Sequence, residues 1–159
     1  MEEIILKHAP SCWTKSTIVG QYELSANELN DISAEVKRAI RSTHLKISSI
    51  KRYQNVYDYG QVLIREQLLT VINPGIQYYR VRRFFVLAKH RLTAGLDYNL
   101  DYRRIGRCSE LTFRKEVAPS DSSEVLIVVQ IITDNLNLSS IQPKNNADYF
   151  IDYIVEFQD

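Results

Sequence analysis

The sequence has 159 residues, of which 45% are hydrophobic and 25% charged, so its composition is that of one globular domain and not of a disordered chain. The formal net charge is +1, which excludes a strong overall field toward nucleic acid or membrane, and no apolar stretch approaches the roughly 20 residues that span a bilayer. The cysteines, Cys12 and Cys108, lie far apart and pair with no histidine at ligand spacing, so we expect reduced thiols, no metal site and an intracellular protein, nuclear or cytoplasmic.

The N-terminal residues predict an irregular segment followed by one strand. Residues 4–6 have the pattern of a short strand or an irregular segment, and Trp13 ends a loop that it should anchor to the core. Ile18, Gly20, Tyr22 and Leu24 alternate with other residues, so we expect a strand over Thr17–Leu24.

A helix is predicted from about Ala26 to Ser42. Ser25 and Glu28 have the spacing of a capping box, in which each side chain accepts a hydrogen bond from a backbone amide at the start of the helix. Apolar residues then recur every three or four positions, and acids precede bases along the polar face as the helix dipole prefers.

A second strand and helix follow through a polar corner. Leu45–Ile50 has the pattern of a strand, and the polar residues 51–55 separate it from apolar residues that recur at helical spacing from Tyr59 onward. The β-branched run Leu69–Ile72 predicts a short strand that ends in the turn Asn73–Gly75.

The second half is rich in strand patterns. We expect a strand over Ile76–Lys89, a loop over Ala94–Arg107, an edge strand over Ser109–Val117, a central strand over Glu124–Thr133, a surface loop over Asp134–Ala147 and a last strand over Tyr149–Phe157. These elements predict an α+β fold for one compact domain over residues 1–159, with two main helices against mostly antiparallel sheets.

One central segment is basic. Residues 80–115 contain ten Lys and Arg and three acids, whereas the remainder contains ten Lys and Arg and sixteen acids. Aromatic residues lie among the arginines, and the interaction candidates are Tyr78, Tyr79, Arg80, Arg82, Arg83, Arg91, Tyr102, Arg103, Arg104 and Arg107. Such a set can dock a protein partner, bind RNA by stacking and phosphate contacts, or simply be solvated, and we expect a protein partner before RNA.

Other chemically capable residues lack partners at a useful spacing. His90 has no carboxylate or nucleophile near it in the sequence, and Cys108 lies near arginines that can lower a thiol pKa without making it functional. Asp97 and Asp101 are four residues apart, but the surrounding sequence does not favour a helix. We expect no catalytic pair among these residues.

Three motifs follow one another in the order found in a known family. They are Pro10-x-x-Trp13, Ser25-x-x-Glu28 and Ile47-x-x-Ile50-x-Arg52-Tyr53-Gln54-Asn55, with Tyr59 in the helix after them. From Pro10 to about Leu69 the chain resembles the catalytic domain of the poly(ADP-ribose) polymerase family, closest to its mono-ADP-ribosylating branch. The resemblance implies an ADP-ribosyltransferase-like fold. We expect the domain to be excised from a larger protein, because the last residues, Val155-Glu156-Phe157, look like a strand with nothing beyond to cap it.

The motifs that carry the chemistry of that family are altered here. Thr70 stands where the resemblance places the histidine of a His-Gly-Thr segment that holds NAD, and Val71 replaces the glycine that lets the ligand approach the backbone. Phe84 keeps the ring of a Gly-x-Tyr-Phe motif whose glycine is lost, and no counterpart of the catalytic glutamate is evident.

These departures imply a degenerate, non-catalytic form of the domain. We expect a pseudoenzyme without a cofactor or an NAD pocket that acts as a protein-interaction scaffold. Two alternatives stay open: an RNA-binding module that uses the basic segment 78–107, and an active ADP-ribosyltransferase with a rearranged site.

Overall fold

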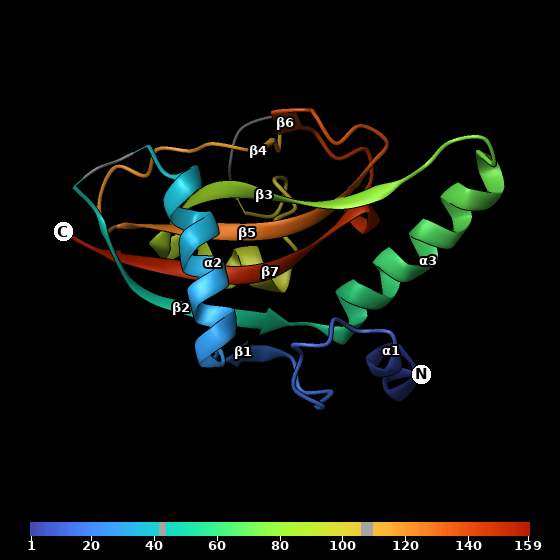
Figure 1. Cartoon of the computed structure of the whole chain (residues 1–159), viewed down its shortest axis with the longest axis horizontal. Coiled ribbons are helices and arrows are strands. Elements are labelled where there is room, and N and C mark those ends of the chain that lie inside the picture. Colours follow the sequence, from blue (N-terminus) through green and yellow to red (C-terminus); the bar gives the residue numbers. More distant parts are fainter. Residues whose placement is uncertain (42–43, 106–109) are drawn as a thin grey trace.

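Seven strands form one sheet in the order β1-β2-β7-β5-β3-β4-β6, and every neighbouring pair is antiparallel (Figure 1). The computed structural model describes residues 1–41, 44–105 and 110–159. Within them the strands are β1 Gly20–Tyr22, β2 Lys46–Gln54, β3 Tyr79–Ala88, β4 Phe113–Arg114, β5 Glu124–Thr133, β6 Ser140–Ile141 and β7 Tyr149–Gln158. The helices are α1 Glu2–Lys7, α2 Ala26–Ala39, α3 Val56–Ile72 and α4 Leu92–Asp97, with 3-10 turns η1 Lys89–Arg91 and η2 Asn146–Asp148.

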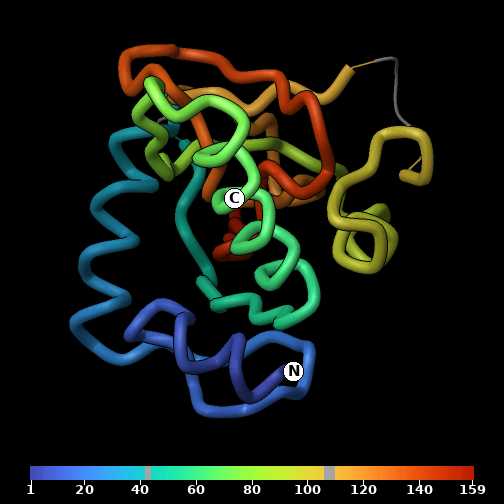
Figure 2. The backbone as a smooth tube through the Cα atoms, turned by 90° about the vertical axis from the view of Figure 1, so that its right-hand side faces the viewer, coloured from blue at the N-terminus to red at the C-terminus, as the bar shows by residue number. Residues whose placement is uncertain are grey.

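The centre of the sheet is buried on both faces. The run in β5 is β-branched and nearly all buried, which suits a strand that is covered from two sides. On one face α2 packs Ile32 and Val36 against Leu126 and Val128. On the other face Ile127 packs with residues of α4 and the segment after it. Figure 2 shows α2 on one side of the sheet and the segment after α4 on the other.

A third cluster joins α1 and α3 to the end of the sheet. The ring of Trp13 lies tilted against that of Tyr59 with centroids 5.1 Å apart, and Tyr59 meets Phe150 of β7 edge-on at 4.9 Å. Trp13 is therefore the predicted anchor of its loop, with 4% of its surface exposed. In Figure 1, α3 leaves this cluster and projects beyond the end of the sheet.

The predicted α+β class with a mainly antiparallel sheet is confirmed, and β5 has the predicted bounds. Helix α2 starts after Ser25 as predicted but ends at Ala39, because Ile40 takes an extended conformation and forms a parallel bridge with Val117. Among the described residues, no helix is long and apolar enough to cross a membrane.

Several predicted boundaries were wrong. Residues 4–6 belong to helix α1, and Leu69–Ile72 forms the end of α3, whose hydrogen-bond ladder continues to Asn73. The backbone amide of Asn73 donates to the carbonyl of Leu69 at 2.9 Å, so the β-branched run stays helical despite its strand propensity. The predicted loop over Ala94–Arg107 starts inside α4.

The edges of the sheet are shorter than the alternating patterns predicted. The strand expected over Thr17–Leu24 is reduced to β1, and the strand expected over Ser109–Val117 is reduced to β4. The expected loop over Asp134–Ala147 contains β6. Alternation of apolar and polar residues does not reveal where a strand stops pairing with the adjacent strand. These edge strands end where that pairing stops.

Candidate interaction surfaces

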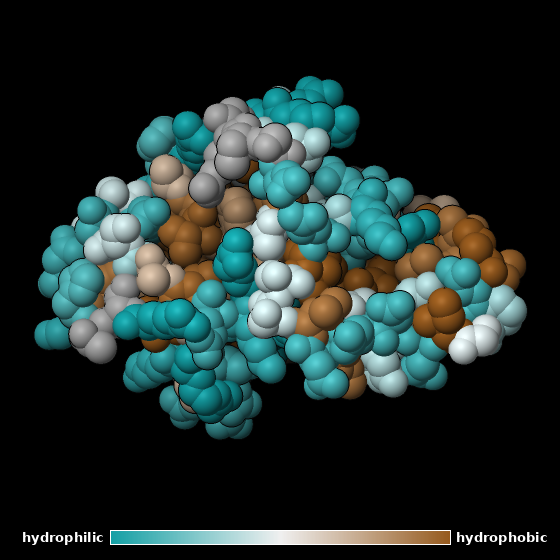
Figure 3. Space-filling view, turned by 90° about the horizontal axis from the view of Figure 1, so that it is seen from above, coloured by the Kyte–Doolittle hydropathy of each residue, from teal (hydrophilic) through white to brown (hydrophobic). Residues whose placement is uncertain are grey.

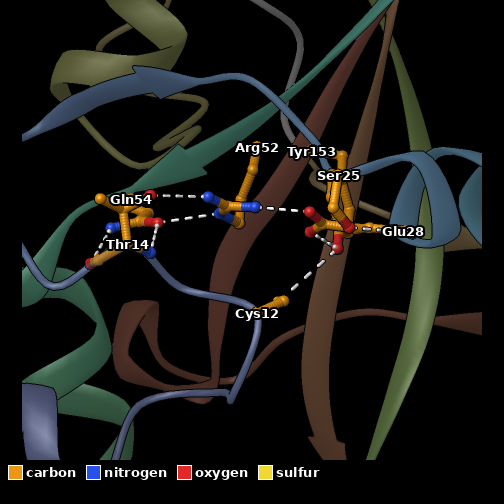
Figure 4. A network of polar contacts seen from close by, with 7 residues as sticks. All are labelled: Cys12, Thr14, Ser25, Glu28, Arg52, Gln54 and Tyr153. Atoms are coloured by element: carbon orange, nitrogen blue, oxygen red, sulfur yellow. Dashed lines mark hydrogen bonds and ion pairs between the residues drawn. The ribbon is translucent and has the colours of Figure 1, made fainter.

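The corner between β2 and α3 is held by a buried polar network (Figure 4). Arg52 of β2 donates from Nη1 to Oε1 of Glu28 at 2.5 Å and from Nη2 to Oγ1 of Thr14 at 2.9 Å. Its Nε donates to Oε1 of Gln54 at 2.8 Å, and Gln54 also bonds to both backbone groups of Thr14. Arg52 and Gln54 are 3% and 1% exposed, so this corner joins the N-terminal loop, α2 and the sheet and offers no polar group to a ligand.

Glu28 has a different partner from the one that a capping box predicts. Ser25 does accept a hydrogen bond from the backbone amide of Glu28, at 3.3 Å. The Glu28 carboxylate, however, turns to Arg52 and accepts a second hydrogen bond from the hydroxyl of Tyr153 at 2.7 Å. Burial raises the pKa of Glu28, but these hydrogen bonds and the charge of Arg52 outweigh it and hold the pKa below its usual value.

The first two arginines of β3 are engaged inside the molecule. Arg80 forms an ion pair with Glu66 of α3, donates to the hydroxyl of Tyr59 at 2.7 Å and lies over the Tyr59 ring at 5.0 Å. Arg82 pairs with Asp152 at 3.0 Å and with Glu35 at 2.8 Å, which joins β3 to β7 and to α2. These guanidinium groups fasten helices to the sheet.

Arg83 points to the opposite face of β3 from Arg80 and Arg82. Its Nη2 donates to the backbone carbonyls of Leu138 at 2.8 Å and Leu136 at 3.3 Å, and its exposed fraction is 5%. Burial lowers the pKa of Arg83. The guanidinium therefore holds the loop between β5 and β6 in place.

The other interaction candidates are distributed over several elements, and Tyr78 and Tyr79 directly precede Arg80. The Tyr78 hydroxyl accepts a hydrogen bond from Asn73 at 2.9 Å, Tyr79 is exposed at the start of β3, and Arg91 lies in η1. Across the sheet, Tyr102 packs on the cluster of α4, Arg103 pairs with Asp101 at 3.1 Å, and Arg104 lies over the ring of Tyr98 at 5.2 Å. Arg107 and Cys108 lie outside the described residues. The basic segment is thus divided between two faces of the sheet.

The three degenerate positions do not meet. Thr70 and Val71 lie in the last turns of α3, where the Thr70 hydroxyl donates to the carbonyl of Glu66 at 2.9 Å and Val71 is 77% exposed. Phe84 is buried in the cluster under α2 and borders an open groove of about 640 Å³. Thr70 and Val71 therefore line no pocket together with Phe84 among the described residues.

Three acids gather around a shallow hollow of about 300 Å³. Asp97 and Asp101 line it together with Arg104 and with Asp58, a residue that the sequence did not single out. Burial raises the pKa of Asp58 to about 6, whereas the hydrogen bond from Arg103 lowers that of Asp101. His90 lies in η1, away from this hollow's lining, and no group of acids, histidines or cysteines in the described part of the chain could hold a metal ion.

The outer face of α3 is apolar and exposed. Ile64, Leu68, Val71 and Ile72 are 71%, 46%, 77% and 58% exposed, and Tyr57 and Ile76 extend the apolar surface at the two ends. Figure 3 shows hydrophobic residues gathered at the end of the molecule that α3 occupies. We call Tyr57, Gln61, Ile64, Leu68 and Val71 the α3 stripe.

No charged residue of α3 lies on this face. Arg65 pairs with Asp148 of η2 at 2.8 Å, Glu66 pairs with Arg80, and Asp58 is half-buried. The residues of α3 that are exposed are Tyr57, Gln61, Ile64, Gln67, Leu68, Thr70, Val71 and Ile72. A surface helix normally turns charged residues to solvent, so this helix departs from the ordinary pattern.

Neither a protein-family model nor a curated protein matches this chain.

Proposed function

We propose that this chain is a non-catalytic domain with an ADP-ribosyltransferase-like fold, and that it acts as a protein-interaction scaffold. The observation that carries the proposal is the α3 stripe, an exposed and mainly apolar surface on one helix. Exposed apolar patches on folded domains mark contact sites, because water is displaced from them favourably when a partner binds.

The stripe fits a helix of the partner. Its members Tyr57, Gln61, Ile64, Leu68 and Val71 follow one another at steps of four, three, four and three residues. This spacing gives a nearly straight seam when two helices cross at a small angle. The 17 residues of α3 make a seam of about 25 Å at a rise of 1.5 Å per residue.

The α3 stripe itself contains no charged residue, although Tyr57 at one end donates to the carboxylate of Glu2, and this composition specifies the chemistry of the partner helix. Interface centres are depleted in charged residues because an unpaired charge loses its hydration on binding. A partner helix with leucine, isoleucine or methionine at matching positions would bury the stripe without that cost. Helix α3 is already ordered, since Asn55 caps it by accepting hydrogen bonds from the amides of Tyr57 and Asp58 at 3.0 and 3.1 Å.

The non-catalytic part of the proposal is supported by the positions of Thr70, Val71 and Phe84. A transferase that uses NAD needs a preorganised pocket, and the residues that the resemblance assigns to it are separated, with Thr70 and Val71 on α3 and Phe84 buried under α2. Calorimetric titration with NAD to millimolar concentration should therefore give no saturable heat. Saturable binding would instead favour an active transferase with a rearranged site.

The scaffold proposal is tested by affinity capture from the native cells, with and without nuclease. We compare the wild type with the double variant Ile64→Asp and Leu68→Asp. The matched control is Ile18→Asp with Leu136→Asp, which places the same charges on exposed apolar residues elsewhere. After nuclease treatment, we expect the wild type and the control to retain the same captured proteins, and the α3 variant to lose them. Equal retention by all three proteins would overturn the assignment to α3.

A crosslinking step identifies the chemistry of the captured protein. A photoreactive amino acid at position 68 should label a segment of the partner with apolar residues at spacings of three and four. Labelling of a segment without such a pattern would contradict a helical partner.

A further inference from the structure

Strand β2 has an edge that the chain leaves uncovered. Strand β1 pairs with only three residues of β2, from Gly20 opposite Gln54 to Tyr22 opposite Arg52. On its other side β2 pairs with β7 as far back as Lys46. In the part of the chain that the structure describes, residues 46–51 therefore have no strand partner on the β1 side, and the backbone groups there are unpaired.

A groove of about 780 Å³ runs along this edge, between β2 and the flank of α2. The consecutive residues 45–49 all line it, together with Leu29, Lys37 and Ile40 of α2. Side chains of a strand alternate between its faces, so five consecutive residues border one groove only where it follows the strand edge. The groove thus presents backbone hydrogen-bonding groups and side chains together.

The lining is apolar and basic. Leu29, Ile40, Leu45 and Ile47 provide the apolar part, and Lys37 and Lys46 provide two positive charges. No acid is among the lining residues, although Ser49 donates to the Glu156 carboxylate at 3.4 Å. A ligand with apolar and acidic side chains complements it in both respects.

A second copy of the chain does not complement this edge. Antiparallel pairing of two such edges about a two-fold axis through residues 48 and 49 places Lys46 of one copy opposite Lys51 of the other. Like charges directly opposite each other destabilise a strand pair. Lysines and bulges are common means by which proteins prevent edge-to-edge association, and β2 has both, with a register shift between Ile47 and Ser49. Lys51 is already paired with Glu23, so it is Lys46 that attracts an acidic segment.

We propose that the edge of β2 and the flank of α2 form a second binding site, which takes an extended segment of a partner protein with alternating apolar and acidic residues. The segment pairs with residues 46–49 as an added strand, in line with β1. Its apolar side chains lie against Ile47 and Leu29 on the α2 face, and its carboxylates lie on the opposite face with Lys46. The exposed Lys37 of α2 adds a second positive charge to the groove. This site is independent of the α3 stripe, so the domain can hold two partners at once.

The probe is a library of random eight-residue peptides displayed on phage, selected on the wild-type domain. Counter-selection uses the variant Lys37→Glu with Lys46→Glu, which reverses both charges at exposed positions. We expect enrichment of peptides that alternate apolar and acidic residues. Enrichment of peptides with other patterns would overturn the proposal. So would the absence of any peptide that binds the wild type better than the counter-selection variant.

The enriched peptide is then synthesised and its affinity measured with three variants. We expect Lys37→Glu with Lys46→Glu to weaken binding at least tenfold. The matched double reversal Arg38→Glu with Lys15→Glu, at exposed positions outside the groove lining, should change it less than twofold. Equal effects would leave only a general charge attraction and contradict the site. The double variant Ile64→Asp and Leu68→Asp should bind the peptide normally, which separates this site from the α3 stripe.

Strand addition has its own signature. Amide hydrogen exchange at residues 46–49 should slow when the peptide binds, and a peptide with proline at alternate positions should not bind because it lacks the required backbone amides. Unchanged exchange there with a bound peptide would exclude pairing with β2.

Discussion

Arg52 of β2 and Glu28 of α2 form an ion pair in which the two side chains are 3% and 9% exposed. The pair is 24 residues apart in the sequence, and Tyr153 of β7 completes it from a third element. A buried pair of this kind is costly to break, because the remaining partner is left charged without its hydration.

We expect Arg52→Ala to lower the free energy of unfolding by about 3–5 kcal/mol. Urea denaturation followed by circular dichroism measures the change, and Glu28→Gln gives a milder version if Arg52→Ala does not fold. The matched control is Arg41→Ala, which removes an ion pair with Glu116 whose side chains are 71% and 51% exposed. That change should cost less than about 1 kcal/mol, so similar losses for Arg52 and Arg41 would contradict a structural role for the corner.

Gly95 of α4 is predicted to tolerate no side chain. A Cβ atom there would lie 2.9 Å from Cδ2 of Leu87 and 3.2 Å from Cδ2 of Leu100, and both leucines are fully buried. We expect Gly95→Ala to lower the free energy of unfolding by about 1–3 kcal/mol despite the higher helix propensity of alanine. Gly20→Ala, where a Cβ meets nothing within 4 Å, should change the stability little. A stabilising effect of Gly95→Ala would mean that α4 can move away from the sheet.

Asp58 should make stability depend on pH. Burial raises its pKa in the folded protein to about 6, from an ordinary value near 4 in the unfolded chain. The folded state therefore binds the proton more tightly, so this contribution to stability is complete below about pH 4 and is lost as the pH rises through 6. The stability of Asp58→Asn relative to the wild type should increase by about 1–2 kcal/mol from pH 4 to pH 8. This figure allows for the favourable interaction of the Asp58 carboxylate with the helix N-terminus, which the variant loses. Parallel stability curves for the two proteins, from urea titrations at each pH, would show that Asp58 is not desolvated.

Single-stranded RNA should bind weakly. Arg80, Arg82 and Arg83 already donate to Glu66, Asp152 and backbone carbonyls, so few guanidinium groups on β3 remain for phosphates. We expect filter-binding affinity no better than about 10⁻⁵ M at 150 mM salt, in the range of non-specific contacts. A submicromolar affinity that falls steeply with salt, and that Arg103→Ala with Arg104→Ala reduces, would restore the RNA-binding alternative.

Local patterns determined those parts of the fold that depend on neighbours in the sequence. Ser25 predicts the start of α2 because its side chain reaches an amide three residues on, and the β-branched run over Glu124–Thr133 predicts a buried strand because its composition suits no exposed element. The two main helices and the antiparallel sheet were predicted from patterns of this kind, which involve residues close together in the sequence.

The partners of the charged residues were decided by the tertiary structure. Glu28 has the spacing of a capping residue, but folding brings Arg52 and Tyr153 to its carboxylate, and these bind it in place of the helix amide. The arginines of β3 have the composition of an exposed basic surface, yet Arg82 meets Glu35 and Asp152 from elements 47 and 70 residues away.

By itself the sequence determined that this chain forms an α+β domain with a buried central strand and a capped α2, because helix caps and strand periodicity depend on residues a few positions apart. Only the tertiary structure decided that Arg80 and Arg82 of β3 lie inside ion pairs and that α3 continues through Leu69–Ile72. It also decided that the outer face of α3 and the β1 side of residues 46–51 are left uncovered by the described part of the chain. Exposure and pairing depend on which distant elements come together, and for a charge the difference between a free group and a buried pair is several kcal/mol.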